Sequence, residues 1–166
     1  MNKLLFGLLL LIFSGILSAN QDAAFLAARD AYIAGKYDLL PTYTKKLNNH
    51  VLAPYVEYYQ LRSNIYKTDT AQILAFLNQH QDTSMAENLR KTWLKVLGHK
   101  GKWDLFAEEY SKVVRTDTEL ICLAHRQRIH ENKPNALANA RRIWFTGYSM
   151  PKGCTPLFRK LISSGQ

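Results

Sequence analysis

Two cysteines, Cys122 and Cys154, are the residues of this chain that could be covalently joined. Because their number is even and the N-terminus has the pattern of an export signal, a disulfide is favoured, with two reduced buried thiols as the alternative. A zinc site is a weaker alternative, because His125 lies three residues from Cys122 but no fourth ligand has suitable spacing. The sequence therefore predicts a disulfide, no metal site and no cofactor.

The acidic residues and histidines give no sign of acid–base catalysis. Most of the 13 acidic residues fall at predicted helix starts or on polar faces, where they cap helices. None is placed in an apolar pocket, and Glu108 and Glu109 are adjacent and so cannot share one helix face. All histidines except His125 fall at predicted helix ends or turns, and no nucleophile elbow, phosphate loop or His-Glu-x-x-His motif occurs. The sequence predicts no catalytic residue.

Basic and aromatic residues could instead bind a partner. The basic residues cluster in segments 125–130, 138–144 and 157–162 and could form one stripe that meets anionic cell-wall polymer or an acidic protein domain, with a scattered solvated surface as the alternative. Tyrosines between residues 55 and 66 are expected to form a seam between packed helices rather than a sugar-stacking surface. The buried side of this helix is expected to carry Val56, Tyr59, Leu61 and Ile65. The candidate glycan- or partner-binding residues are Arg126, Arg128, Arg141, Arg142, Arg159, Lys160, Tyr55, Tyr58 and Tyr59.

The N-terminus has the order of a secretory signal peptide. Lys3 precedes an apolar run over Leu4–Phe13, and small residues lead to Ala19, after which cleavage is expected. An uncleaved anchor is the alternative. Residues 20–166 would then form one scaffold domain, and a monomer is expected. With a formal net charge of +9 on the whole chain, an exported protein should meet anionic glycans, lipid headgroups or acidic proteins, and nucleic acid is not expected as a partner.

The elements that must position these residues are all predicted to be helices. Apolar residues recur at helical spacing, and no stretch has the two-residue alternation of an exposed strand. Gly35 marks a helix end before the next helix, which is expected to begin around Lys36, and Pro41 and Pro54 suit the first turns of helices. Further helices are expected over 117–131, 134–146 and from residue 151 or 155 to 163. The helix over 134–146 is expected to approach its neighbours closely through Ala136, Ala138, Ala140 and Ile143. Helix pairs recur at about 30 to 40 residues, as in helical repeats. The prediction is an all-α fold, a right-handed α-superhelix (solenoid) of short antiparallel helix pairs, an architecture that usually offers a curved binding surface.

Several blocks of the chain are similar to a known family. They include Leu-Ala-Pro-Tyr-Val-Glu-Tyr-Tyr-Gln-Leu at 52–61 and Gly-Lys-Trp-Asp-Leu at 101–105. The most specific block follows Cys122 and reads Trp-x-x-Gly-x-Ser-x-Pro-x-x-Cys, then Leu-Phe, over 144–158. Together these blocks resemble the N-terminal superhelical region of soluble lytic murein transglycosylases, and the similarity covers nearly all of residues 20–166.

The resemblance implies a fold, a location and a reaction. Members of that family are periplasmic enzymes of Gram-negative bacteria that cleave the MurNAc–GlcNAc bond of peptidoglycan without water and leave a 1,6-anhydromuramoyl end. Their N-terminal region is a non-catalytic superhelix, and the cysteines matching Cys122 and Cys154 would form a disulfide. Their lysozyme-like catalytic domain, with a Glu-Ser motif, lies at the far C-terminus. No Glu-Ser pair occurs in this chain, so the resemblance transfers no catalytic residue to it.

Three hypotheses for function remain. In the first, the chain is the helical scaffold of a periplasmic lytic transglycosylase, without the catalytic domain, as a truncated product or a fragment. In the second, it is a stand-alone periplasmic helical-repeat module that binds a protein or peptidoglycan. The third, an enzyme acting alone, would need a buried carboxylate in a pocket, which the sequence does not predict.

Overall fold

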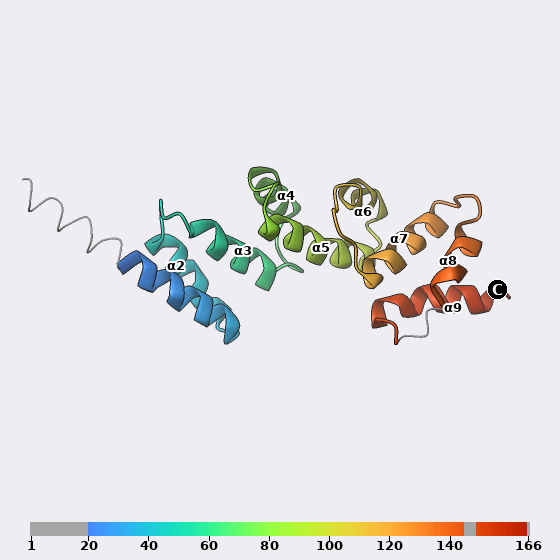
Figure 1. The fold of residues 1–166 in the computed structure, drawn as a ribbon, viewed down its shortest axis with the longest axis horizontal. Helices are drawn as coiled ribbons and strands as arrows, with labels where there is room; N and C mark the ends of the chain where they lie inside the picture. Colours follow the sequence, from blue (N-terminus) through green and yellow to red (C-terminus); the bar gives the residue numbers. More distant parts are fainter. Residues whose placement is uncertain (1–19, 145–148, 166) are drawn as a thin grey trace, which may run out of the picture. The chain divides into compact units, whose positions relative to one another are not determined.

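The structure, a computed structural model, describes residues 20–144 and 149–165. Helices and turns make up this part of the chain, and no strand occurs within it, so the predicted all-α fold is confirmed (Figure 1). The predicted signal peptide over 1–19 and most of the connector over 145–148 lie outside the described residues. The right-handed superhelix over the whole chain stays a prediction.

The chain divides into two compact units, one ending at Ile73 and the other beginning at Leu74. The boundary lies inside α4 (Thr70–Gln79). Unit 1 contains a helix over 20–33, the 3-10 helix η1 (Tyr37–Leu39), α2 (Leu40–Lys46) and α3 (Ala53–Ser63). Unit 2 contains α5 (Ser84–His99), α6 (Trp103–Tyr110), α7 (Thr118–His130), α8 (Ala136–Trp144), the 3-10 helix η2 (Lys152–Cys154) and α9 (Thr155–Ser163).

In unit 1, a glycine and two prolines at the ends of helices and a small apolar core stabilise the packing of three helices. Gly35 has a φ of +73°, a left-handed conformation that costs glycine little, and it ends the first helix as predicted. Pro41 and Pro54 occupy the first turns of α2 and α3, where a missing N–H leaves no bond unmade. The core consists of Ala28, Leu47 and Val56, one residue from each helix or the turn that follows it, with Ala24, Phe25, Tyr43 and Ala53 packed around them.

In unit 2, α5 is the central helix and contacts both α6 and α7. Thr83 caps α5 by accepting a hydrogen bond from the N–H of Ala86. Gly101 has a φ of +68° and closes the turn to α6, as the sequence predicts. Gly98 lets α5 approach α7 closely, because a Cβ there would lie 2.8 Å from Leu123 Cδ2.

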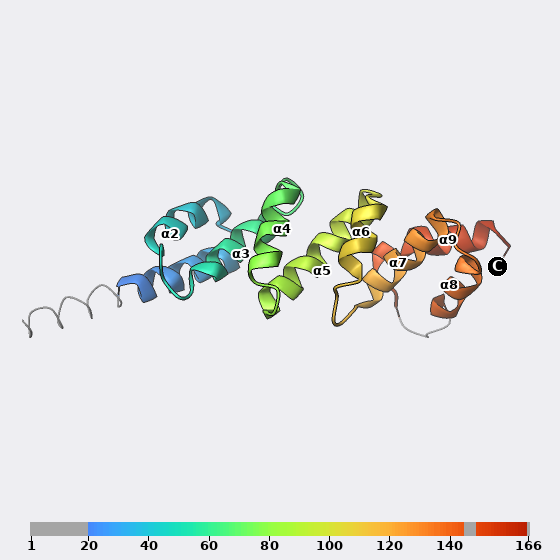
Figure 2. The same cartoon turned by 90° about the horizontal axis from the view of Figure 1, so that it is seen from above.

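A disulfide lies at the centre of the last four elements of unit 2. Cys122 on α7 is bonded to Cys154 at the end of η2, with their Cα atoms 5.2 Å apart. Both are fully buried in a cluster with Ala140, Leu157 and Leu161. Ala136 is buried as expected, whereas Ala138, which the sequence also suggested for close helix approach, is exposed because it lies on the opposite side of α8. Figures 1 and 2 show α7, α8 and α9 gathered at the C-terminal end of the described chain.

Candidate functional site

The candidate tyrosines of α3 lie in an aromatic cluster of unit 1. Tyr59 stacks on Tyr32 of the first helix, with ring centroids 4.4 Å apart and an interplanar angle of 12°. Tyr58 is only 7% exposed, and its hydroxyl accepts a hydrogen bond of 2.7 Å from Arg62 Nη1. Tyr55 is 38% exposed and meets Phe25 edge to face. The tyrosines therefore form an inter-helix seam, with Tyr55 the most exposed of the three candidates.

The sequence placed Tyr59 rather than Tyr58 on the buried side of α3. The structure reverses this order, because Arg62 one turn later covers Tyr58 and gives its hydroxyl a partner. Tyr59 is half-buried, and one face of its ring packs on the ring of Tyr32, although the side chain is not fully enclosed. Burial raises the pKa of Tyr32 and of Tyr59, while nearby arginines oppose this shift. Both phenols are therefore neutral hydrogen-bonding groups at neutral pH.

The basic candidates on α7 lie beside α6. The guanidinium of Arg126 lies 5.3 Å from the ring centre of Trp103, a cation–π contact, and burial lowers its pKa. Arg128 is exposed, and its charge acts on Tyr110 and on His125. His125 is itself half-buried, and its Nδ1 has no hydrogen-bond partner among the described residues. Burial, and secondarily Arg128, lower the pKa of His125.

The other basic candidates lie on α8 and α9. Arg141, Arg142, Arg159 and Lys160 are all exposed. The helices that carry them contact each other and α7. Their arrangement as one continuous stripe with the arginines of α7 stays a prediction.

A network of charges joins the start of α7 to α5. Lys95 Nζ lies 2.9 Å from Asp117 Oδ2 and 3.2 Å from Glu119 Oε2, and His99 Nε2 lies 3.1 Å from Glu119 Oε1. Partial burial disfavours the charged form of Lys95, but the two carboxylates outweigh it and raise its pKa. Gly153 of η2 packs against this network, because a Cβ there would lie 2.7 Å from Glu119 Cγ.

One carboxylate of unit 2 is buried, which the sequence did not predict. Glu109 is 1% exposed, and its Oε2 accepts a hydrogen bond of 3.1 Å from Nε of Arg90, which is 6% exposed. Lys112 bonds the other oxygen of Glu109 and also contacts Glu108. Two cations thus neutralise this carboxylate, an arrangement that holds α5 to the end of α6. The burial of Glu109 could have been predicted from its spacing, because it lies three residues after the apolar Phe106 and so on the same face of α6.

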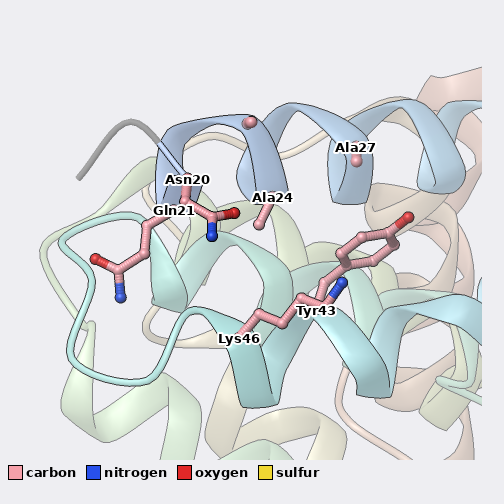
Figure 3. A pocket seen from close by; sticks show the side chains of 7 residues that line it. Asn20, Gln21, Ala24, Ala27, Tyr43 and Lys46 are labelled. Carbon is pink, nitrogen blue, oxygen red and sulfur yellow. The ribbon is translucent and has the colours of Figure 1, made fainter. Parts of the chain in front are cut away.

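The two units contain separate hollows. In unit 1, a cavity of about 500 Å³ lies between the first helix and α2, where Tyr43 and Lys46 face Ala24 and Ala27 (Figure 3). In unit 2, one groove of about 410 Å³ lies beside the Arg90–Glu109 pair, and another of the same size is formed by α7, α8 and α9. Among the candidate binding residues, Lys160 lines the last of these. None of the other candidates lines the three hollows described here.

Within 20–144 and 149–165, no three His, Cys, Asp or Glu side chains come together as a metal site requires. No helix in this range has the length and apolar character needed to cross a membrane.

Comparisons with known proteins give one consistent result. No protein-family model matches the sequence. The soluble lytic murein transglycosylases of Escherichia coli strains K12 and O157:H7 are each 23% identical to this chain, over 96% of it and 25% of the relative. The chain therefore spans about a quarter of the length of these curated relatives.

Solved structures of the same class have a similar fold. The 70 kDa soluble lytic transglycosylase of Escherichia coli matches with a TM-score of 0.70 and 21% identity, over 89% of this chain and 24% of that one. The lytic transglycosylase Slt of Pseudomonas aeruginosa matches with a TM-score of 0.69 and 26% identity, over 86% of this chain and 23% of that one. The resemblance found in the sequence is thus confirmed: this chain is homologous to soluble lytic murein transglycosylases over about a quarter of their length.

Proposed function

We propose that this chain is a non-catalytic helical scaffold of the lytic transglycosylase type, exported to the periplasm, where it binds peptidoglycan. The observation that carries the proposal is the match of 89% of the chain to a quarter of a murein transglycosylase. We assign that quarter to the N-terminal superhelical region. In a complete enzyme, such a scaffold would hold the glycan near a catalytic domain.

The surface chemistry supports a binding role. Exposed cations on α8 and α9 attract anionic polymers over several ångströms, and the carboxylates of peptidoglycan peptides make the cell wall such a polymer. The buried carboxylate of Glu109 is paired with Arg90 and Lys112, and Glu109 is not among the residues that line the groove beside this pair. Holding peptidoglycan without cutting it is the function that fits these residues.

Retention on isolated cell-wall sacculi tests the proposal. The full chain should sediment with sacculi and release no soluble anhydro-muropeptides. The Arg141→Glu/Arg142→Glu variant should be retained less, whereas the control Lys45→Glu/Lys67→Glu, which changes the charge equally on exposed residues of unit 1, should be retained nearly as well as the wild type. A wild-type chain that stays in the supernatant, or that cuts the sacculi, would refute the proposal.

A second candidate function is that of a stand-alone periplasmic module that binds a protein or peptidoglycan. The observation in its favour is the groove of about 410 Å³ formed by α7, α8 and α9, whose described lining comes from unit 2 alone. Detection of the native protein in a periplasmic extract separates the two functions. A band near the 19.1 kDa of this chain, or slightly below after signal removal, indicates the module, and a band several times larger indicates the scaffold of a whole enzyme.

A further inference from the structure

The groove formed by α7, α8 and α9 has a lining that is both polar and apolar. It lies where the C-terminal end of α7 and the loop after it meet the first turn of α8, with α9 contributing one side chain. Its volume of about 410 Å³ is in the range of pockets that hold small ligands. The lining residues are Ile129, Asn132, Lys133, Asn135, Ala136, Leu137, Ala138 and Lys160.

The charged residues in the described lining of this groove, Lys133 and Lys160, are both basic. Glu131 is the last acidic residue in the sequence, and all charged side chains in residues 132–166 are basic. Glu131 Oε2 lies 3.5 Å from Lys133 Nζ, and its other oxygen accepts a hydrogen bond from Gln127. Lys160 is exposed and pairs with no acidic side chain in the described part of the chain. The described lining thus contains two ammonium groups and no carboxylate, and Glu131 beside it pairs with Lys133, which leaves the groove net positive.

The uncharged part of the lining suits a peptide. Asn132 and Asn135 have φ values of 52° and 57°, in the left-handed region, and lie on either side of the Lys133–Pro134 pair. Their amides can both donate and accept hydrogen bonds, as a peptide group requires. Ile129 and Leu137 are partly buried against the disulfide cluster and form an apolar floor. No aromatic ring is among the described lining residues, so this described lining offers no stacking surface of the kind that a sugar ring or a base would use.

We propose that this groove binds a short peptide that carries carboxylate groups, with Lys133 and Lys160 contacting the carboxylates and the two asparagines contacting the backbone. The inference rests on the proposed function, since in the cell wall the ligand of this chemistry is the acidic peptide attached to muramic acid. It goes beyond that function because it assigns recognition to the peptide and not to the glycan strand. The disulfide cluster, which holds the three helices together beneath the groove, keeps its walls in place.

Calorimetric titration of the full chain with a defined peptide tests this inference. The probe is L-Ala-γ-D-Glu-meso-diaminopimelate, and the comparison probe is the same tripeptide with its carboxylates amidated. The acidic peptide should bind and the amidated one should bind at least about tenfold more weakly, because the charge attraction is lost. Equal binding of both peptides, or no binding of the acidic one, would overturn the inference.

Matched variants separate the groove from general charge attraction. Lys133→Glu/Lys160→Glu should weaken binding of the acidic peptide by about tenfold or more. Lys102→Glu/Lys152→Glu makes the same charge change at exposed residues of unit 2 that neither line the groove nor belong to the candidate binding residues, and its affinity should stay within about threefold of the wild type. Equal losses in the two variants would assign binding to net charge and contradict a groove site. Circular dichroism verifies that both variants remain helical, and Lys133→Gln/Lys160→Gln repeats the test without charge reversal.

Sacculi distinguish failure of this inference from failure of the proposed function. Sacculi stripped of peptides by an amidase should retain much less of the wild-type chain than untreated sacculi. If stripped and untreated sacculi retain it equally, peptidoglycan binding stands and the peptide groove is refuted. If neither retains it, the proposed function fails as well.

Discussion

Breaking the disulfide should weaken unit 2 and leave unit 1 unchanged. Cys122 and Cys154 are 32 residues apart in sequence, and the chain-entropy estimate for a loop of that length is about 3.7 kcal/mol. This is a large fraction of the roughly 5 to 15 kcal/mol that stabilises a typical domain. Both cysteines are fully buried, so replacement by serine would add the cost of burying a hydroxyl. Cys122→Ala/Cys154→Ala is the better perturbation, because alanine brings no polar group into the cluster.

Urea unfolding, followed by circular dichroism with and without dithiothreitol, measures this effect. Reduction of the wild type removes the cross-link but keeps both sulfur atoms in the cluster, so it should lower the free energy of unfolding of unit 2 by about 3 to 4 kcal/mol. The alanine variant also loses the packing of the sulfur atoms and should fall roughly 1 to 2 kcal/mol below the reduced wild type. Dithiothreitol should not change the variant, which contains no cysteine. Fluorescence of Trp93 and Trp103 reports on unit 2 in the same titration.

Two results would refute this reasoning. If the wild type unfolds at the same urea concentration with and without dithiothreitol, no cross-link stabilises the fold. If reduction instead shifts the transition measured by circular dichroism but leaves the transition measured by tryptophan fluorescence unchanged, the stabilisation does not come from the cluster around the two cysteines.

Two further predictions concern single residues of unit 2. Gly153→Ala should destabilise the chain by about 1 to 3 kcal/mol in thermal unfolding, because the new Cβ overlaps the side chain of Glu119. In the double variant, Glu119→Ala should restore most of this lost stability. A loss that persists in full in the double variant would exclude this contact as the cause. Burial lowers the pKa of His125 in the folded state, so protonation favours the unfolded chain and stability should fall as the pH drops below about 6.5. In His125→Leu this part of the pH dependence should be absent, as measured by urea midpoints between pH 8 and pH 5; an unchanged profile would assign the dependence to other groups.

Local patterns were sufficient to predict most helix boundaries. The expected helix over 117–131 is α7 (Thr118–His130), the one over 134–146 is α8 (Ala136–Trp144), and the later of the two expected starts of the last helix, residue 155, is correct for α9 (Thr155–Ser163). These boundaries depend on prolines, glycines and capping residues, whose effect is confined to the adjacent turn. The start expected near Lys36 is less accurate, because a 3-10 helix over Tyr37–Leu39 precedes α2.

Contacts between helices were much harder to predict. The stacking of Tyr59 on Tyr32 and the pair of Arg90 with Glu109 join residues that are 27 and 19 positions apart, and no local pattern specifies which helix faces will meet. Glu108 and Glu109 differ in burial, since Glu108 is exposed and Glu109 is buried, although Lys112 contacts both carboxylates. Which of the two faces inward depends on where α5 lies. The tyrosine seam was predicted as a class of contact, but its buried member was misassigned for the same reason.

The most specific block of the family resemblance has a structural explanation in its described part. The N–H of Cys154 donates a hydrogen bond to the carbonyl of Pro151, which forms the turn of η2, and the disulfide then holds this turn against α7. Gly153 must lack a side chain because the turn lies on Glu119. Proline, glycine and cysteine in this block are therefore required for the attachment of α9 to α7, and none of them provides a group for catalysis. A scaffold can keep such a block while its exposed side chains change. The resemblance therefore identifies the fold of this chain. The proposed ligand is instead inferred from surface residues such as Lys133 and Lys160.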